Sequence, residues 1–276
     1  MPADTGNIER TADAPASGPT ATAADAAHPV QVPALTVEKL CFRYPNGRQA
    51  LDNVSFQLRE REILAVVGPS GAGKSTLLLH LNGLLPKQLE EPSAGAIQIG
   101  RIPMQKAHLT EIRRLVGFLF QDPDDQLFCP TVREDVAFGP LNLGLNAGEV
   151  EQRVVESLEA VGLSSFAERS TLQLSVGERK RVCLAGVLAC RPSILALDEP
   201  FSNLDPRARK SLIAILRRFE GSLILTTHDL DTVVELCDRV IILDEGRVRA
   251  EGVPAEILSR PQLMERHGLE VPMRLR

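Results

Sequence analysis

The residue types and spacing of Gly68–Thr76, which read Gly-Pro-Ser-Gly-Ala-Gly-Lys-Ser-Thr, suit phosphate binding. An apolar, β-rich run, Ile63–Val67, precedes them, and helically spaced apolar residues follow up to Leu85. A strand, a glycine-rich turn and a helix form the context that a G-x-x-x-x-G-K-[ST] match requires. Such a turn directs backbone N–H groups at phosphate oxygens, and the start of the helix adds positive potential. We therefore expect nucleoside triphosphate binding rather than an ordinary glycine-rich turn.

Two side chains of this loop have chemistry of their own. We expect Lys74 to reach the β- and γ-phosphates and Ser75 to offer its hydroxyl to Mg²⁺. The glycines allow the backbone to curl around the phosphates. The candidate nucleotide-binding residues of the loop are Gly68, Pro69, Ser70, Gly71, Ala72, Gly73, Lys74, Ser75 and Thr76.

Two carboxylates, Asp198 and Glu199, follow the short apolar run Ile194–Leu197. In open α/β sheets, ligands bind beyond the carboxyl ends of the strands. Carboxylates that are buried there need a partner, for which a metal ion is suitable. This pair is therefore a second candidate for the chemistry of the site.

The composition limits the class of protein. The chain has 276 residues, a formal net charge of −5 and a sequence pI of about 5.7, so no basic field favours nucleic acid as a partner. Its five cysteines are scattered and form no C-x-x-C pair, which favours a reduced, cytosolic setting. No apolar run has the length needed to span a bilayer, so we expect any membrane association to be peripheral.

The elements that position these residues follow in order along the chain. Residues 1–33 have few large apolar side chains, and we expect a disordered extension. Leu35–Phe42 and Leu51–Leu58 are expected strands, and Leu115–Phe120 is a third. Glu149–Val161 has the apolar spacing of a helix.

Further along, the basic triplet Arg179–Arg181 is interpreted as a solvated helix face, which is the usual role of such a run. Ser222–Thr227 is an expected strand that leads directly to His228. Val240–Leu243 and Arg247–Ala250 are expected to pair as a hairpin.

The order of these motifs resembles the nucleotide-binding subunit of ABC transporters over about residues 35–252. The resemblance implies an α/β fold of the P-loop NTPase class, an ABC-type ATPase domain at 34–252. This domain would combine a RecA-like core sheet, an antiparallel β subdomain and a helical signature subdomain at about 122–190. A short helical tail would follow at 253–276.

The resemblance also implies roles for single residues. By itself, Tyr44 could either anchor the turn as a hydrophobic side chain or stack on an adenine. In the family pattern it matches the aromatic residue that stacks on adenine. Gln121 matches the glutamine that contacts Mg²⁺ and the attacking water. Asp198 would hold Mg²⁺ together with Ser75, and Glu199 would be the general base. His228 matches the histidine that contacts the γ-phosphate, and Asp205 matches the aspartate of the D-loop. The signature segment of the family corresponds here to Leu174, Ser175, Val176, Gly177 and Glu178.

In the family, ATP lies between two head-to-tail subunits, and the signature of one completes the site of the other. The resemblance therefore implies an obligate dimer, and a homodimer is favoured because one chain carries every catalytic element. Val176 departs from the family pattern, because a glycine is expected there. Valine does not adopt positive φ cheaply, so we expect a β or α backbone here. Either the glycine is dispensable, or closure on ATP is weakened, or a different partner subunit supplies a better half-site; we favour the first, since Ser175 and Gly177 are present.

Phe120–Phe128 and Glu134–Pro140 closely resemble the ATPases of energy-coupling-factor importers, especially those for cobalt and nickel. The resemblance implies a transmembrane coupling subunit and a substrate-capture membrane subunit as partners, at the cytoplasmic face of the membrane. Asp124 and Asp125 would offer carboxylates to arginines of the coupling subunit. The alternative for this pair is an acidic surface loop.

Other functions stay open at this point. The chain could serve an energy-coupling-factor importer of vitamins or an ordinary ABC importer. A soluble ABC ATPase of DNA repair or translation usually carries a coiled-coil insertion or a second ATPase domain, for which 276 residues leave no room. A P-loop kinase or GTPase would lack the signature segment that precedes Asp198.

Overall fold

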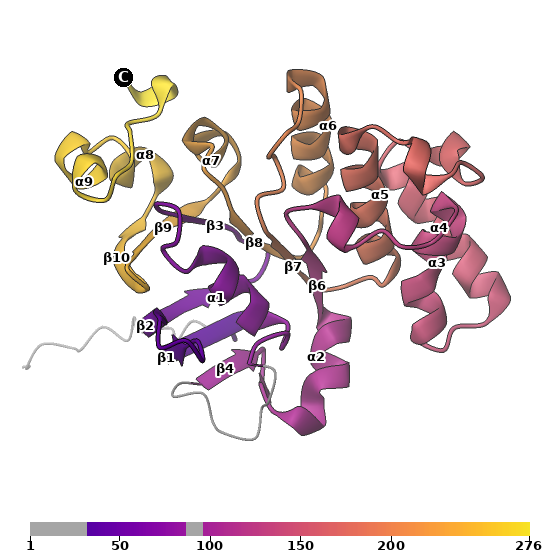
Figure 1. The fold of residues 1–276 in the computed structure, drawn as a ribbon, viewed down its shortest axis with the longest axis horizontal. Helices are drawn as coiled ribbons and strands as arrows, with labels where there is room; N and C mark the ends of the chain where they lie inside the picture. Colours follow the sequence, from indigo (N-terminus) through magenta and orange to yellow (C-terminus); the bar gives the residue numbers. More distant parts are fainter. Residues whose placement is uncertain (1–31, 87–95) are drawn as a thin grey trace, which may run out of the picture. The chain divides into compact units, whose positions relative to one another are not determined.

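The strands form two sheets (Figure 1) in a computed structural model that describes residues 32–86 and 96–276. The extension expected at residues 1–33 lies outside the described residues, except for Val32 and Pro33. The larger sheet consists of β3 (Ile63–Val67), β6 (Val116–Leu119), β7 (Ile194–Leu197), β8 (Ser222–Thr226), β9 (Arg239–Asp244) and β10 (Arg247–Gly252). Their spatial order is β10-β9-β3-β8-β7-β6.

All neighbours in this sheet are parallel except β10, which pairs antiparallel with β9. The expected hairpin is therefore confirmed. Because β3, β6, β7 and β8 are parallel, their carboxyl ends meet at one edge of the sheet. The phosphate loop, Gln121, the two carboxylates and His228 follow these four strands, so the topology brings them to the same edge.

Both faces of the larger sheet are buried. Alternate residues of β3 belong to different hydrophobic clusters: Ala65 and Val67 to one, Leu64 and Val66 to the other. This is the pattern of a parallel sheet covered on both sides. It explains why the strands read as continuous apolar runs in the sequence.

The smaller sheet is antiparallel and covers the phosphate-loop helix α1 (Lys74–Leu81). Leu77, Leu78 and Leu81 of α1 are in one hydrophobic cluster with residues of this sheet. The helix ends at Leu81 rather than Leu85, because Gly83 adopts a φ of 71° that stops it. The strands of the smaller sheet, in the order β2-β1-β4-β5, are β1 (Leu35–Arg43), β2 (Gln49–Leu58), β4 (Ala96–Ile99) and β5 (Ile102–Pro103).

Three helices pack together on one side of the larger sheet: α3 (Val132–Asn142), α4 (Ala147–Ala160) and α5 (Val176–Ala189). Figure 1 shows them away from β1, β2 and β4. Each of the three starts with a capping box, in which the N-cap side chain and a glutamate three residues later satisfy each other's N–H groups. The two sheets and this helical group confirm the expected fold class.

The helices not yet named are α2 (Leu109–Leu115), α6 (Pro206–Arg217), α7 (Leu230–Leu236), α8 (Pro254–Ile257) and α9 (Pro261–Arg266), and the short 3₁₀ turns include η2 (Pro123–Asp125). No helix of residues 32–86 and 96–276 is both long enough and apolar enough to cross a membrane.

Candidate active site

The phosphate loop joins the carboxyl end of β3 to α1, and its path requires glycine. Gly68 has a φ of 154°, and a Cβ there would lie 1.9 Å from the carbonyl oxygen of Leu243. Gly73 has a φ of 106°, and a Cβ there would lie 2.4 Å from the carbonyl oxygen of Ala50. Gly73 is also the N-cap of α1 and offers no side chain to the first N–H groups of the helix. These N–H groups and the helix dipole can therefore bind an anion.

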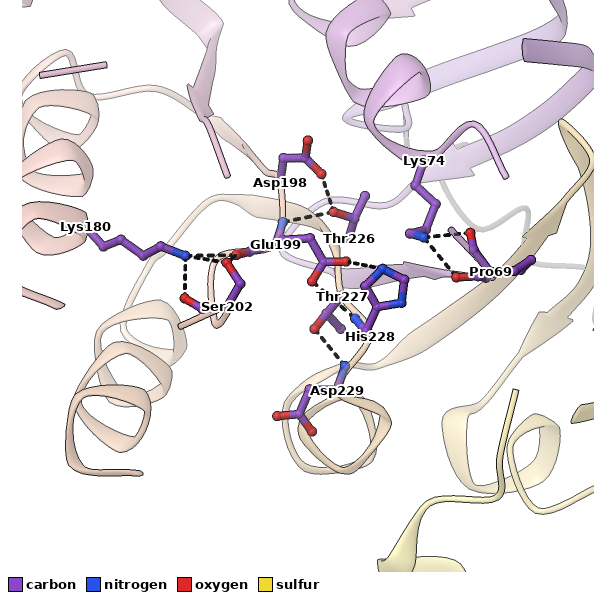
Figure 2. A network of polar contacts seen from close by, with 11 residues as sticks. Pro69, Lys74, Lys180, Asp198, Glu199, Ser202, Thr226, Thr227, His228 and Asp229 are labelled. Atoms are coloured by element: carbon purple, nitrogen blue, oxygen red, sulfur yellow. Dashed lines mark hydrogen bonds and ion pairs between the residues drawn. The ribbon is translucent and has the colours of Figure 1, made fainter. Parts of the chain in front are cut away.

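Lys74 lies across this loop (Figure 2). Its Nζ donates to the carbonyl oxygens of Gly68 at 2.9 Å and Pro69 at 3.0 Å. Burial lowers the pKa of the ammonium group, and the negative charges of Glu199 and Asp198 partly oppose this shift. The cation therefore lies between the loop and the carboxylates that follow β7.

Asp198 and Glu199 are both buried and are held by Thr226, the last residue of β8 (Figure 2). Thr226 Oγ1 donates to Asp198 Oδ1 at 2.6 Å. The same oxygen accepts from the Glu199 backbone N–H at 3.0 Å. The fully buried threonine thus fixes one oxygen of Asp198 and the backbone of Glu199 relative to the neighbouring strand.

The carboxylate of Glu199 faces His228. Glu199 Oε2 accepts from the His228 backbone N–H at 3.2 Å, and Oε1 lies 3.2 Å from His228 Nε2 in a geometry that makes no hydrogen bond. Burial raises the pKa of Glu199, while the charges of His228 and Lys74 act in the opposite direction. Glu199 therefore combines a raised affinity for a proton with an oxygen that has no hydrogen-bond donor among the described residues. Those are the properties of a general base.

Tyr44 lies in the turn after β1, beside the start of α1. Its hydroxyl is 2.9 Å from Thr76 Oγ1, and its ring packs edge to face with the ring of Phe42, with centroids 4.9 Å apart. The structure therefore brings Tyr44 to the phosphate-loop helix, although it is 32 residues from Thr76 in the sequence.

The signature segment forms the start of α5. Leu174 is buried, Ser175 is the N-cap and Val176 is the first helical residue. Val176 therefore has the helical backbone that we expected as one of two alternatives. Ser175 Oγ donates to Glu178 Oε2 at 2.7 Å, and this hydrogen bond lowers the pKa of Glu178. Gly177 lies on the helix face toward α6, where a Cβ would be 3.2 Å from Ala208 Cβ.

The described residues include no hydrogen bond or ion pair between this segment and the phosphate loop of the same chain. Asp205 lies near the signature instead, as the N-cap of α6, where it accepts from the N–H groups of Arg207 and Ala208 at 2.8 and 2.9 Å. Ser175, Gly177 and Asp205 line one hollow of about 360 Å³.

Gln121 and the acidic pair follow β6. Gln121 is exposed, and its side chain makes no hydrogen bond to another described residue. The following turn, η2, contains Asp124 and Asp125. Asp124 Oδ1 forms an ion pair with Arg179 NH1 at 3.0 Å, which the sequence did not predict. The pair joins the turn after Gln121 to the helix that begins at the signature.

The interpretation of Arg179–Arg181 as a solvated face is wrong for its middle residue. Lys180 is only 2 % exposed, and its ammonium group lies against the loop after Asp198. The spacing of Lys180, Cys183, Leu184 and Val187, all buried on one helix face, is a signal that could have placed it inside. Thr226 was also missed, because β8 is buried on both faces and no periodicity marks which side chain meets the carboxylates.

Comparison with known proteins agrees with this geometry. The protein-family model described as ABC transporter matches residues 51–202. The energy-coupling factor transporter ATP-binding protein EcfA of Carboxydothermus hydrogenoformans is 48% identical over 243 residues, which cover 87% of this chain and 88% of that protein.

Two solved structures are similar over most of the chain. CbiO1 of Clostridium perfringens, described as part of the ABC transporter complex cbiONQ, has a TM-score of 0.75 and 35% identity, with 85% of this chain and 94% of that chain covered. The ATP-binding cassette MJ0796, solved as a dimer bound to ADP and Pi, has a TM-score of 0.70 and 29% identity, with 80% and 98% covered.

Proposed function

The chain belongs to the ABC transporter family as an ATP-binding, ATP-hydrolysing subunit, and we propose that it powers an energy-coupling-factor importer of cobalt or nickel ions. The observation that carries the ATPase part is the shared edge of the larger sheet. Lys74, Asp198, Glu199 and His228 follow three strands and lie close together: the charges of Glu199 and Asp198 act on the pKa of Lys74, and those of His228 and Lys74 act on the pKa of Glu199. This arrangement is suited to phosphoryl transfer to water, which needs positioning and charge stabilisation more than covalent chemistry.

In the proposed site the phosphate loop, Gly68–Thr76, binds the phosphates of ATP. The uncapped N–H groups of α1 support this role, as does the ammonium of Lys74, which can exchange its two carbonyl partners for phosphate oxygens. Tyr44 stacks on the adenine from its position beside Thr76. Glu199 accepts the proton of the attacking water, and His228 donates a hydrogen bond to the γ-phosphate.

Ser75, Gln121 and Asp198 are the proposed ligands of Mg²⁺, Asp198 mainly through water. Their fit is good because all three offer oxygen atoms, and the second carboxylate oxygen of Asp198 accepts no hydrogen bond from the described residues. When bound, the ion neutralises charge on the β- and γ-phosphate oxygens. Thr226 keeps Asp198 oriented for this ligation.

Members of this family act as dimers with membrane subunits. We place the signature, Leu174–Glu178, against the ATP of a second copy of this chain, with Asp205 beside it. The position of Ser175 at the N-terminus of α5 supports this role, because its hydroxyl and the following N–H groups can bind a phosphate.

The proposed partner in the membrane docks in a groove beside η2. The groove has a volume of about 400 Å³, and its lining includes Phe128 and Phe138, whose side chains are exposed. Large exposed apolar side chains at a groove are typical of an interaction site. Asp124 and Asp125, next to this groove, would bind arginines of the coupling subunit. The chain would then be held at the cytoplasmic face of the membrane as a peripheral subunit, and it would not touch the transported ion.

The catalytic assignment is tested with Glu199→Gln and, as a matched control, Glu220→Gln, an exposed glutamate near the other end of β7. We expect Glu199→Gln to bind ATP normally and to lose about 10²- to 10⁴-fold in turnover. The control should retain both properties. Full turnover in Glu199→Gln would remove Glu199 from the role of general base.

The transport assignment is tested by purifying the tagged protein from detergent-solubilised native membranes. Recovery of a small transmembrane coupling subunit and a capture subunit with metal ligands is the expected result. Two larger permease subunits would indicate an ordinary ABC importer, and soluble partners alone would refute the transport function. Asp125→Lys should abolish the recovery, whereas Glu265→Lys, an equal charge change on α9, should not.

A further inference from the structure

Lys180 is one of the largest fully buried side chains of the described residues, at 2 % exposure. Lysine is almost never buried to this extent without a charged partner. Within residues 32–86 and 96–276, however, no carboxylate forms an ion pair with it. The ammonium group instead enters the loop that follows β7 (Figure 2).

Four oxygen atoms of this loop surround Lys180 Nζ. They are the backbone carbonyl oxygens of Glu199 at 3.1 Å, Pro200 at 3.3 Å and Ser202 at 2.8 Å, and Ser202 Oγ at 2.8 Å. An ammonium group has three N–H donors, so these acceptors saturate it. Burial lowers the pKa of Lys180, and the charges of Glu199 and Asp122 oppose that shift. The cation thus compensates its desolvation with backbone carbonyl groups of one loop.

The first of these carbonyl groups belongs to a strained residue. Glu199 has a φ of 43°, in the left-handed region that a residue with a Cβ adopts only at a cost in free energy. Such a conformation persists when the surroundings hold it in place. Here the Glu199 N–H is bound by Thr226 Oγ1 at 3.0 Å. Its carbonyl oxygen accepts from Lys180 Nζ at 3.1 Å, from Ser202 Oγ at 2.9 Å and from the Ser202 backbone N–H at 3.2 Å.

The conformation of this backbone decides where the carboxylate lies. A rotation of the Glu199 backbone toward an ordinary φ would move its side chain away from His228 and Lys74. Thr226 restrains only the N–H side of the residue, so the restraint on the carbonyl side comes from Lys180 and from Ser202. Ser202 is itself held by Lys180 through two of its oxygen atoms.

We propose that Lys180 is a positioning residue for the general base: its buried ammonium group fixes the left-handed backbone of Glu199 and so aims the carboxylate at the attacking water. The proposal rests on the role of Glu199 under the proposed function. Lys180 also lies one turn after the first residue of α5, so the helix that begins at the signature contacts the loop that contains Glu199. A movement of α5 when the signature engages a second copy would reach Glu199 through this contact.

The test compares Lys180→Met with Arg153→Met in the full chain. Arg153 is a matched control, because its guanidinium also caps a carbonyl group of α5, that of Ala189 at 2.9 Å, but at the opposite end from the signature. We expect Lys180→Met to lower kcat about 10- to 100-fold, the effect of losing a charged hydrogen-bond donor, with KM and ATP affinity changed less than about threefold. Arg153→Met should keep kcat within about threefold. Equal losses in the two variants would mean that Lys180 only packs the helix, and would overturn the proposal.

A double-mutant cycle shows whether Lys180 acts through Glu199. On a Glu199→Gln background, Lys180→Met should lower single-turnover hydrolysis less than about threefold, because the group it positions is already gone. A full additional loss on that background would refute the positioning role. Normal turnover in Glu199→Gln alone would refute the proposed base instead, so the two failures are distinguishable.

If Lys180→Met does not fold, Ser202→Ala serves as the second variant, since it removes one acceptor of the ammonium and one donor to the Glu199 carbonyl group. We expect a fall in kcat of about 2- to 10-fold at unchanged ATP affinity, again absent on the Glu199→Gln background. An unchanged kcat in folded Ser202→Ala would overturn the proposal.

Discussion

Val176→Gly restores the glycine that the family pattern expects, and the structure predicts a small effect. Val176 is the first residue of α5, directly after the N-cap Ser175, and it has a negative, helical φ. Valine adopts this backbone without strain, so no left-handed conformation is relieved by glycine. The exchange loses helix propensity and the contacts of a half-buried side chain at the first position of the helix, together about 1 kcal/mol.

That free energy sets an upper limit on the kinetic effect. If all of it were lost from the closed, ATP-bound dimer, about 1 kcal/mol would correspond to about a fivefold fall in turnover. The neighbouring Gly177 behaves differently, because its face of the helix packs against Ala208. We therefore expect the ATPase activity of Val176→Gly to differ from that of the natural chain by less than tenfold, and the free energy of unfolding to fall by about 1 kcal/mol or less.

The assay is steady-state ATP hydrolysis at saturating ATP, together with thermal unfolding. Val155→Gly is a suitable control, because Val155 is 52% exposed on α4, so the same exchange there reports the helix cost alone. A gain of more than tenfold in Val176→Gly would show that valine slows closure on ATP. A loss of more than tenfold in a folded protein would show that the valine side chain itself takes part in the site. Either result would refute the reasoning.

Three further predictions concern nucleotide binding, stability and the signature. Lys74→Ala should weaken ATP binding itself, measured with a fluorescent nucleotide, because it removes the cation that lies across the phosphate loop; normal affinity would contradict the loop assignment. Glu62→Gln should lower the free energy of unfolding in urea by about 2 kcal/mol, since it removes the buried carboxylate that binds Arg239 at 2.7 Å and leaves the guanidinium only its ion pair with the more exposed Glu251. Gly177→Ala should reduce turnover more than Val176→Gly does, because the new Cβ would lie 3.2 Å from Ala208 Cβ on α6. A larger loss in Val176→Gly than in Gly177→Ala would contradict this.

The arrangement of the site at one edge of the sheet was predictable from the sequence. Apolar runs that end at Gly68, Asp198 and His228 identify parallel strands, and parallel strands bring their carboxyl ends together. The capping boxes at Thr131 and Asn146 are local, so the helix starts follow from neighbouring residues. Ser175 and Glu178 have the same spacing and form the third such box.

What the sequence did not predict depends on contacts between distant segments. A basic triplet has the same composition whether its middle residue points to solvent or inward, so Lys180 becomes recognisable only when the helix face is compared with the buried stripe of α5. The ion pair of Asp124 with Arg179 joins residues 55 positions apart, and no local pattern marks it.

The left-handed backbone of Glu199 is the extreme case, because local preference argues against it. A residue with a Cβ occupies that region only when tertiary contacts compensate the cost, and here they come from Thr226 on β8 and Lys180 on α5. A strained residue that two separate elements hold is typical of a functional site. The conformation of the proposed base is therefore a property of the assembled fold, and both elements must be in place before Glu199 can act.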